Sequence, residues 1–180
     1  LIGRAELLAR IMAQRFSIGV AGAHGKTTTT SMMGTMLLEA GLDPTIVVGG
    51  ILPAIGSNAC WGQGKYLVAE ADESDGSFLR LLPEIAVVTN VEDDHLDYYL
   101  TIERIQQAFR QYVEQVPPEG FAVLGIDSQP VAAMAASINV PHVTYGLKNP
   151  LAEFTARDIV YTEVGTRSQA YHNGQLLGTL

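Results

Sequence analysis

A glycine-rich loop between an apolar run and a helix-forming segment is the feature that most constrains the fold of this chain. Residues 16–21 are largely apolar, as in a buried strand, and residues 28–40 are good helix formers that end at Gly41, a residue favoured just after a helix. The loop between them reads Gly22-Ala23-His24-Gly25-Lys26-Thr27-Thr28. A strand, a glycine-rich loop and a helix in this order predict a phosphate-binding loop in an α/β sheet.

The chemistry of this loop favours a polyphosphate ligand. Backbone N–H groups in such a loop turn inward, and the N-terminus of the following helix adds partial positive charge. We predict that residues 22–28 bind a nucleotide, that Lys26 contacts its β and γ phosphates, and that Thr27 offers its hydroxyl to Mg²⁺. The strict Walker pattern has glycine where this chain has Val20. A purely structural turn is the alternative, and Gly-Lys-Thr-Thr in this context argues against it.

The rest of the chain alternates between predicted strands and helices. Predicted helices cover residues 1–16, 28–40, 101–116 and 131–138, and predicted strands cover residues 16–21, 45–48, 66–69, 86–89, 121–124 and 142–145. This alternation predicts a mostly parallel sheet flanked by helices, with ligands at the carboxyl ends of the strands. Residues 154–164 and 168–180, with a hairpin signal at Asn173-Gly174, predict a small antiparallel β appendage near the C-terminus.

Carboxylates collect directly after the predicted strand 66–69. Residues 70–75 read Glu-Ala-Asp-Glu-Ser-Asp, so four carboxylates lie within six residues. Like charges this close repel one another, and a hard cation is one reason to gather them at a strand terminus. A solvated acidic loop is the alternative. Glu70 is closest to the strand end, so we predict that it is the metal ligand of the group.

A histidine lies in a second acidic segment, residues 89–97, which follows the predicted strand 86–89. A lone histidine is more often structural than functional. His95, however, is predicted to lie at the same edge of the sheet as Glu70 and the glycine-rich loop. We therefore predict that Thr27, Glu70 and His95 converge on a metal site, with Lys26, Glu70 and His95 as the catalytic group.

Composition narrows the class of protein further. At 180 residues and 47% hydrophobic, the chain has the size and apolar content of one folded domain. A net charge of −8 argues against duplex nucleic acid or an anionic membrane as the main partner. The single cysteine, Cys60, excludes an intrachain disulfide framework and fits a reducing compartment. Sequence hydropathy predicts no membrane span.

These motifs together resemble the central ATP-binding domain of the Mur ligase family. The resemblance is carried by residues 4–9, 22–30, 42–45 with Gly49-Gly50, 66–78 and 89–99. Residues 101–180 follow the family pattern more loosely. Because the chain begins with Leu1, we expect residues 1–180 to be one such domain, truncated at both ends, without the family's N-terminal UDP-binding domain and its C-terminal domain.

The resemblance implies an ATP-dependent amide ligase of the bacterial cytoplasm, acting in peptidoglycan synthesis. The segments around Glu70 and His95 are most similar to the branch that joins L-alanine to UDP-N-acetylmuramate through an acyl phosphate. By motif position, Lys26 contacts phosphates, Thr27 and Glu70 bind Mg²⁺, and His95 holds a second metal, for which Mn²⁺ is an alternative. Asn58, Asp72 and Ser74 are implied on the sugar-nucleotide side.

The absence of a lysine after the histidine motif reduces the number of family branches that the chain can resemble. Later Mur ligases place a carbamylated lysine on the helix after the histidine motif, whereas this chain reads Gln107-Ala108-Phe109-Arg110 there. Both the alanine-adding branch and a murein-peptide recycling ligase tolerate this absence, so the recycling ligase is one alternative function. A nucleotide-binding module without catalysis is another, and an unrelated P-loop kinase or GTPase is a third.

Overall fold

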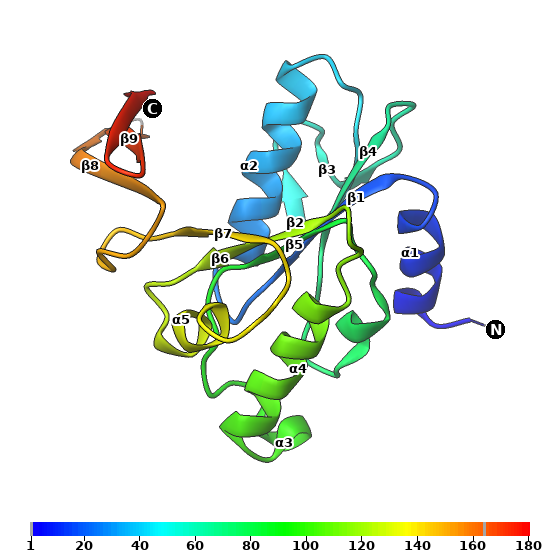
Figure 1. The fold of residues 1–180 in the computed structure, drawn as a ribbon. Helices are drawn as coiled ribbons and strands as arrows, with labels where there is room; N and C mark the ends of the chain where they lie inside the picture. Colours follow the sequence, from blue (N-terminus) through cyan, green and yellow to red (C-terminus); the bar gives the residue numbers. More distant parts are fainter. Residues whose placement is uncertain (1, 164) are drawn as a thin grey trace.

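The computed structural model describes residues 2–163 and 165–180 (Figure 1). Leu1 and Val164, which belong to a predicted helix and a predicted strand, lie outside the described residues. The helices are α1 (Arg4–Met12), α2 (Lys26–Glu39), α3 (Leu96–Tyr99), α4 (Ile102–Glu114) and α5 (Gln129–Ala135), with a 3₁₀ turn, η1 (Ser77–Arg80). The strands are β1 (Phe16–Ala21), β2 (Thr45–Leu52), β3 (Ser57–Cys60), β4 (Tyr66–Glu70), β5 (Ile85–Val88), β6 (Phe121–Gly125), β7 (His142–Tyr145), β8 (Phe154–Thr162), β9 (Gly165–His172) and β10 (Gln175–Thr179).

All the strands belong to one sheet, in the order β10-β9-β8-β7-β6-β5-β1-β4-β2-β3. The ladders from β2 through β4, β1, β5 and β6 to β7 are parallel, and those of β3 on β2 and of β9 with β8 and β10 are antiparallel. Parallel strands need crossover connections, and α2, α4 and α5 lie in those from β1 to β2, from β5 to β6 and from β6 to β7, whereas the connection from β2 to β4 contains β3. The predicted fold class, a mostly parallel sheet flanked by helices with an antiparallel C-terminal appendage, is confirmed.

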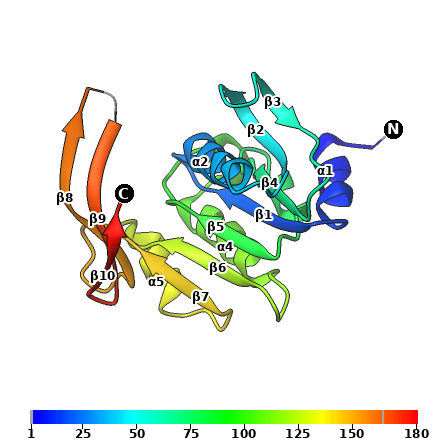
Figure 2. The same ribbon diagram turned by 90° about the horizontal axis from the view of Figure 1, so that it is seen from above.

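Helices cover both faces of the parallel part of the sheet (Figure 2). On one face α1, η1, α4 and α5 enclose the largest apolar cluster, and on the other α2 packs over β1 and β4. Side chains of a strand alternate between these faces, so Leu67 and Ala69 join the first cluster while Val68 joins the second. Burial on both faces explains why these strands are almost continuously apolar.

Two glycines of β2 account for one difference from the sequence prediction. The predicted strand 45–48 ends at Gly49-Gly50, whereas β2 runs through both glycines to Leu52 and then pairs with β3. A Cβ at Gly49 would lie 2.8 Å from the Glu70 carboxylate, so this glycine allows the close approach of Glu70 and does not mark a strand end. The short elements β3, η1 and α3 are likewise absent from the prediction.

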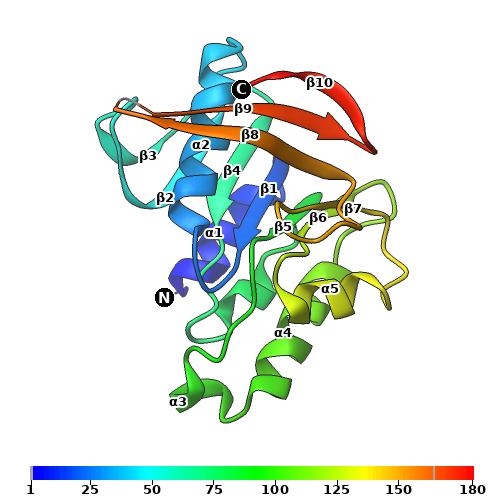
Figure 3. The same cartoon turned by 90° about the vertical axis from the view of Figure 1, so that its left-hand side faces the viewer.

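The C-terminal strands form a small appendage on the β7 edge, seen from its own side in Figure 3. β9 begins at Gly165, earlier than the predicted residue 168, and Asn173 and Gly174 form the predicted turn with positive φ values of 49° and 81°. The ladder between β7 and β8 consists of a single pair, Tyr145 with Phe154. The appendage is therefore joined to the parallel sheet by few backbone contacts.

Candidate active site

The loop between β1 and α2, residues 22–28, has the backbone shape of a phosphate loop. Gly22 has φ of 144°, and a Cβ there would lie 2.0 Å from Thr89 Oγ1. Gly25 has φ of 81° and precedes α2, which begins at Lys26. Both positions require glycine, because a side chain would be strained at either φ and would also collide at Gly22. The first amides of α2 have no intrahelical acceptors and are the donors this loop can offer to an anion.

The segment after β5 fixes the tip of the phosphate loop. Asn90 Oδ1 accepts a hydrogen bond from the His24 amide at 2.9 Å, and Asn90 Nδ2 donates to the His24 carbonyl at 2.9 Å. Thr89 Oγ1 donates to the same carbonyl at 2.6 Å, and the Ala23 amide donates to the Asn90 carbonyl at 3.2 Å. The amides of Ala23 and His24 are thus engaged within the protein, so an anion would meet the amides that follow them.

Lys26 is held by three oxygen atoms. Its Nζ donates to the Gly22 carbonyl at 2.7 Å, to the Ala23 carbonyl at 3.4 Å and to Glu73 Oε1 at 2.8 Å. The Lys26 side chain is 16% exposed, so the ammonium is largely shielded from solvent where it contacts the loop carbonyls.

Thr27 and Glu70 form a pair of hard oxygen donors beside the loop. Thr27 Oγ1 lies 3.1 and 3.0 Å from the two Glu70 carboxylate oxygens, and the Gly49 amide donates to Glu70 Oε2 at 2.7 Å. A hydroxyl and a carboxylate are ligands that suit Mg²⁺. Among residues 2–163 and 165–180, no point gathers three or more His, Cys, Asp or Glu side chains. The predicted set of Thr27, Glu70 and His95 holds only two such side chains, and its metal-binding role stays a prediction.

His95 lies against a different glutamate, Glu73, which also contacts Lys26. Its Nε2 is 3.5 Å from Glu73 Oε1 and 3.8 Å from Asp94 Oδ2, and its backbone is left-handed with φ of 54°. Tyr99, one turn later in α3, donates its hydroxyl to the Glu73 carbonyl at 2.6 Å. Burial raises the pKa of the Tyr99 hydroxyl, so it stays protonated and remains a donor across the ordinary pH range.

A cavity of about 520 Å³ opens between α1 and the strands β2 and β3, next to the phosphate loop. Lys26 and Glu70 line it together with Asn58 and Asp72, which were predicted on the substrate side. Ser74 is not part of the lining, and its amide donates to Asp72 Oδ1 at 3.1 Å. The walls from α1 are mainly apolar, and Arg4 lies at 3.8 Å from Asp72 Oδ2.

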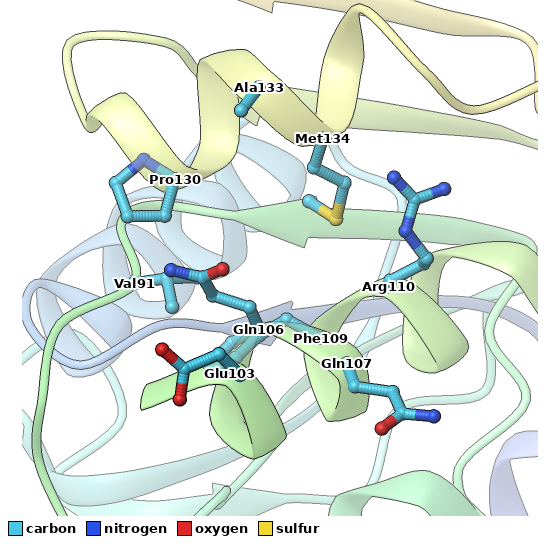
Figure 4. A pocket seen from close by; sticks show the side chains of 9 residues that line it. All are labelled: Val91, Glu103, Gln106, Gln107, Phe109, Arg110, Pro130, Ala133 and Met134. Atoms are coloured by element: carbon cyan, nitrogen blue, oxygen red, sulfur yellow. The ribbon is translucent and has the colours of Figure 1, made fainter. Parts of the chain in front are cut away.

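A second cavity, of about 290 Å³, lies between α4 and α5 (Figure 4). Gln107 and Arg110 line it, whereas Ala108 and Phe109 are buried in the main core. The stretch 107–110 thus contributes two polar side chains to this cavity. In the part of the chain that the structure describes, no helix is long and apolar enough to cross a membrane.

The fold and the phosphate loop define the class of protein: an α/β nucleotide-binding domain with its site at the carboxyl ends of parallel strands. A sequence profile described as the Mur ligase middle domain matches residues 20–177, and the chain therefore belongs to this family. Relatives named UDP-N-acetylmuramate–L-alanine ligase are 51% identical in Pelotomaculum thermopropionicum and 52% identical in Sorangium cellulosum, each over 177 residues. These alignments cover 98% of this chain and 38% of each relative, so the chain spans well under half of their length.

Solved structures agree with this family. The UDP-N-acetylmuramate-alanine ligase MurC of Thermotoga maritima superposes with a TM-score of 0.83 at 25% identity, over 98% of this chain and 38% of that one. The UDP-N-acetylmuramate:L-alanyl-gamma-D-glutamyl-meso-diaminopimelate ligase of Neisseria meningitides superposes with a TM-score of 0.85 at 27% identity, over 99% and 59%.

Sequence reasoning did not single out two residues of this site. Glu73 contacts both Lys26 and His95. Among the carboxylates of residues 70–75, the sequence pattern singled out only Glu70, as the metal ligand. Asn90 holds the phosphate loop through the His24 backbone, and its only signal in the sequence is its place after a predicted strand.

Proposed function

We propose that this chain is the central ATP-binding domain of a ligase that joins L-alanine to the lactyl carboxylate of UDP-N-acetylmuramate. The observation that carries the proposal is the juxtaposition of Lys26, Thr27 and Glu70 beside the loop between β1 and α2. The alanine ligases named above, about half identical to this chain, support the choice of substrates. Because the chain spans 38% of those proteins, the UDP-binding and C-terminal domains belong to the proposed full-length ligase.

The proposed reaction has two steps, phosphoryl transfer from ATP and then formation of the amide. The substrate carboxylate attacks the γ phosphorus and ADP leaves, which gives an acyl phosphate. The amino group of L-alanine then attacks the acyl carbon, and the amide forms as inorganic phosphate leaves and the amine loses a proton. Phosphoryl transfer of this kind depends mainly on alignment and on neutralising charge.

Residues of this chain supply that alignment in the proposal. Lys26 and the first amides of α2 hold the β and γ phosphates. Thr27 and Glu70 hold Mg²⁺, which neutralises phosphate charge when bound. His95 holds a second metal, with Mn²⁺ as an alternative because imidazole is an uncommon ligand of Mg²⁺. Asn58 and Asp72, which line the cavity, contact the sugar nucleotide, and Ser74 supports Asp72 through its backbone amide. The reaction takes place in the cytoplasm.

A murein-peptide ligase is the second candidate, because one structure with a TM-score of 0.85 carries that name. Its identity to this chain is 27%, against 51% and 52% for the alanine ligases of Pelotomaculum thermopropionicum and Sorangium cellulosum, and these two relatives favour alanine. The test offers the purified full-length protein ATP and UDP-N-acetylmuramate with either L-alanine or the murein tripeptide, and measures amide product and released phosphate. We expect product with alanine. Product with tripeptide alone would reject the choice, and nucleotide binding without phosphate release would indicate a binding module.

A further inference from the structure

Glu73 is the only charged residue among the buried polar residues of the described chain, at 2% exposed. Its Oε1 lies 2.8 Å from Lys26 Nζ and 3.5 Å from His95 Nε2. Its Oε2 is buried and has no hydrogen-bond partner among the described residues. A buried carboxylate is costly unless it is paired, and an unpartnered oxygen adds to that cost. The placement of Glu73 therefore points to a role in the site rather than in folding.

The backbone of Glu73 is anchored from the same element that carries His95. The Tyr99 hydroxyl donates to the Glu73 carbonyl at 2.6 Å, and His95 is the residue that precedes α3. Both ends of α3 therefore contact residue 73. These contacts tie the segment after β5 to the segment after β4, and they fix the left-handed backbone of His95 next to the carboxylate.

We propose that Glu73 is a positioning residue that fixes the orientation of the His95 imidazole beside Lys26. The inference rests on the proposed function, in which Lys26 binds phosphates and His95 binds a metal. A carboxylate beside one ring nitrogen fixes the orientation of an imidazole and leaves the other nitrogen as the metal ligand. With Nε2 facing Glu73, the nitrogen left to His95 is Nδ1.

The negative charge of Glu73 should affect nucleotide binding and metal binding differently. A carboxylate 2.8 Å from Lys26 repels a polyphosphate bound by the same lysine. Lys26 keeps its contacts with the Gly22 and Ala23 carbonyls when Glu73 is replaced, so removing that charge should leave the affinity for ATP unchanged or higher. Loss of orientation should instead lower the affinity for the metal and the rate of turnover. A residue with only a structural role would not divide the effects in this way.

The test compares Glu73→Gln with Glu119→Gln in the full-length ligase. Glu119 is exposed and lies between α4 and β6, so its variant makes the same charge change away from the site. We expect Glu73→Gln to weaken Mn²⁺ binding to the ADP complex about tenfold or more, measured by electron paramagnetic resonance, and to lower kcat by a similar factor. The KM for ATP should not rise, and Glu119→Gln should stay within about twofold of wild type.

A second arm uses the His95→Ala background. If Glu73 acts through His95, adding Glu73→Gln there should cause no further loss of Mn²⁺ affinity. Additive losses, or Mn²⁺ affinity of Glu73→Gln within about twofold of wild type, would overturn the proposal. If Glu73→Gln does not fold, Tyr99→Phe replaces it, with weaker Mn²⁺ binding as the supporting result and unchanged binding as the opposing one. Wild-type protein that binds no ADP and forms no amide refutes the proposed function instead.

Discussion

The hydrogen bonds between Asn90 and the His24 backbone should contribute measurably to nucleotide affinity and to stability. Asn90→Ala removes the two hydrogen bonds, both 2.9 Å long, between its side chain and the His24 backbone. Side-chain hydrogen bonds contribute about 0.5–1.5 kcal/mol each, so the pair contributes about 1–3 kcal/mol. Water competes at this exposed position, which places the value at about 1–2 kcal/mol.

This free energy should appear in nucleotide affinity as well as in stability. In the variant the loop loses part of its fixed shape, and binding must then order it. At 1.4 kcal/mol per factor of ten, the dissociation constant for Mg-ATP should rise about 5- to 30-fold. Isothermal titration calorimetry measures that constant, and urea denaturation measures the free energy of unfolding.

Asn139→Ala is the matched control, because Asn139 is exposed and lies between α5 and β7. It should leave both quantities unchanged. If Asn90→Ala folds and binds Mg-ATP within about twofold of wild type, the phosphate loop does not depend on the hydrogen bonds from Asn90, and the prediction is refuted.

Three further predictions concern other named contacts. Lys26→Ala should weaken Mg-ATP binding about 10- to 100-fold, because it removes a charge-assisted contact to phosphate, and unchanged calorimetric affinity in a folded variant would reject the phosphate-loop assignment. Glu70→Gln should lower kcat about 100-fold and His95→Ala should lower it less, and wild-type metal dependence in Glu70→Gln across Mg²⁺ and Mn²⁺ titrations would show that Glu70 is not a metal ligand. Burial opposes ionisation of Asp127, but hydrogen bonds from the backbone amides of residues 147–149 outweigh it and hold its pKa below the ordinary value of 3.8. The stabilising contribution of Asp127 is therefore present above about pH 4 and is lost as pH falls further, so Asp127→Asn should be less stable than wild type near pH 6 and should show a smaller drop on acidification.

Local sequence patterns predicted the parallel part of the sheet closely. The bounds of β1 and β7 match the predicted strands, and Gly41, with φ of 70°, follows α2 as predicted. These features depend on residues close together in the chain. β3 could not be predicted in the same way, because its partner β2 contains Gly49-Gly50, which reads as a turn in sequence, whereas Gly49 lies within the strand and against the Glu70 carboxylate.

The candidate site also has features that the sequence predicts and features that it does not. Its place at the carboxyl ends of the strands followed from the order of motifs, since that order fixes the topology of a parallel sheet. The choice between Glu70 and Glu73 depends on burial and on contacts with α2 and α3, neither of which has a signature in an acidic segment. Glu73 is buried whereas Asp75, two residues later, is exposed, although both are acidic and neighbours in sequence.

The single ladder pair between β7 and β8 has a consequence for hydrogen exchange. Tyr145 and Phe154 form the only strand pairing that links the appendage to the parallel sheet within the described residues. Amides of β8, β9 and β10 therefore need not wait for the sheet to open before they exchange with solvent. We expect them to form a cooperative unit of lower protection than β1, β4 and β5, so that the appendage can unfold and reform while the nucleotide site stays intact.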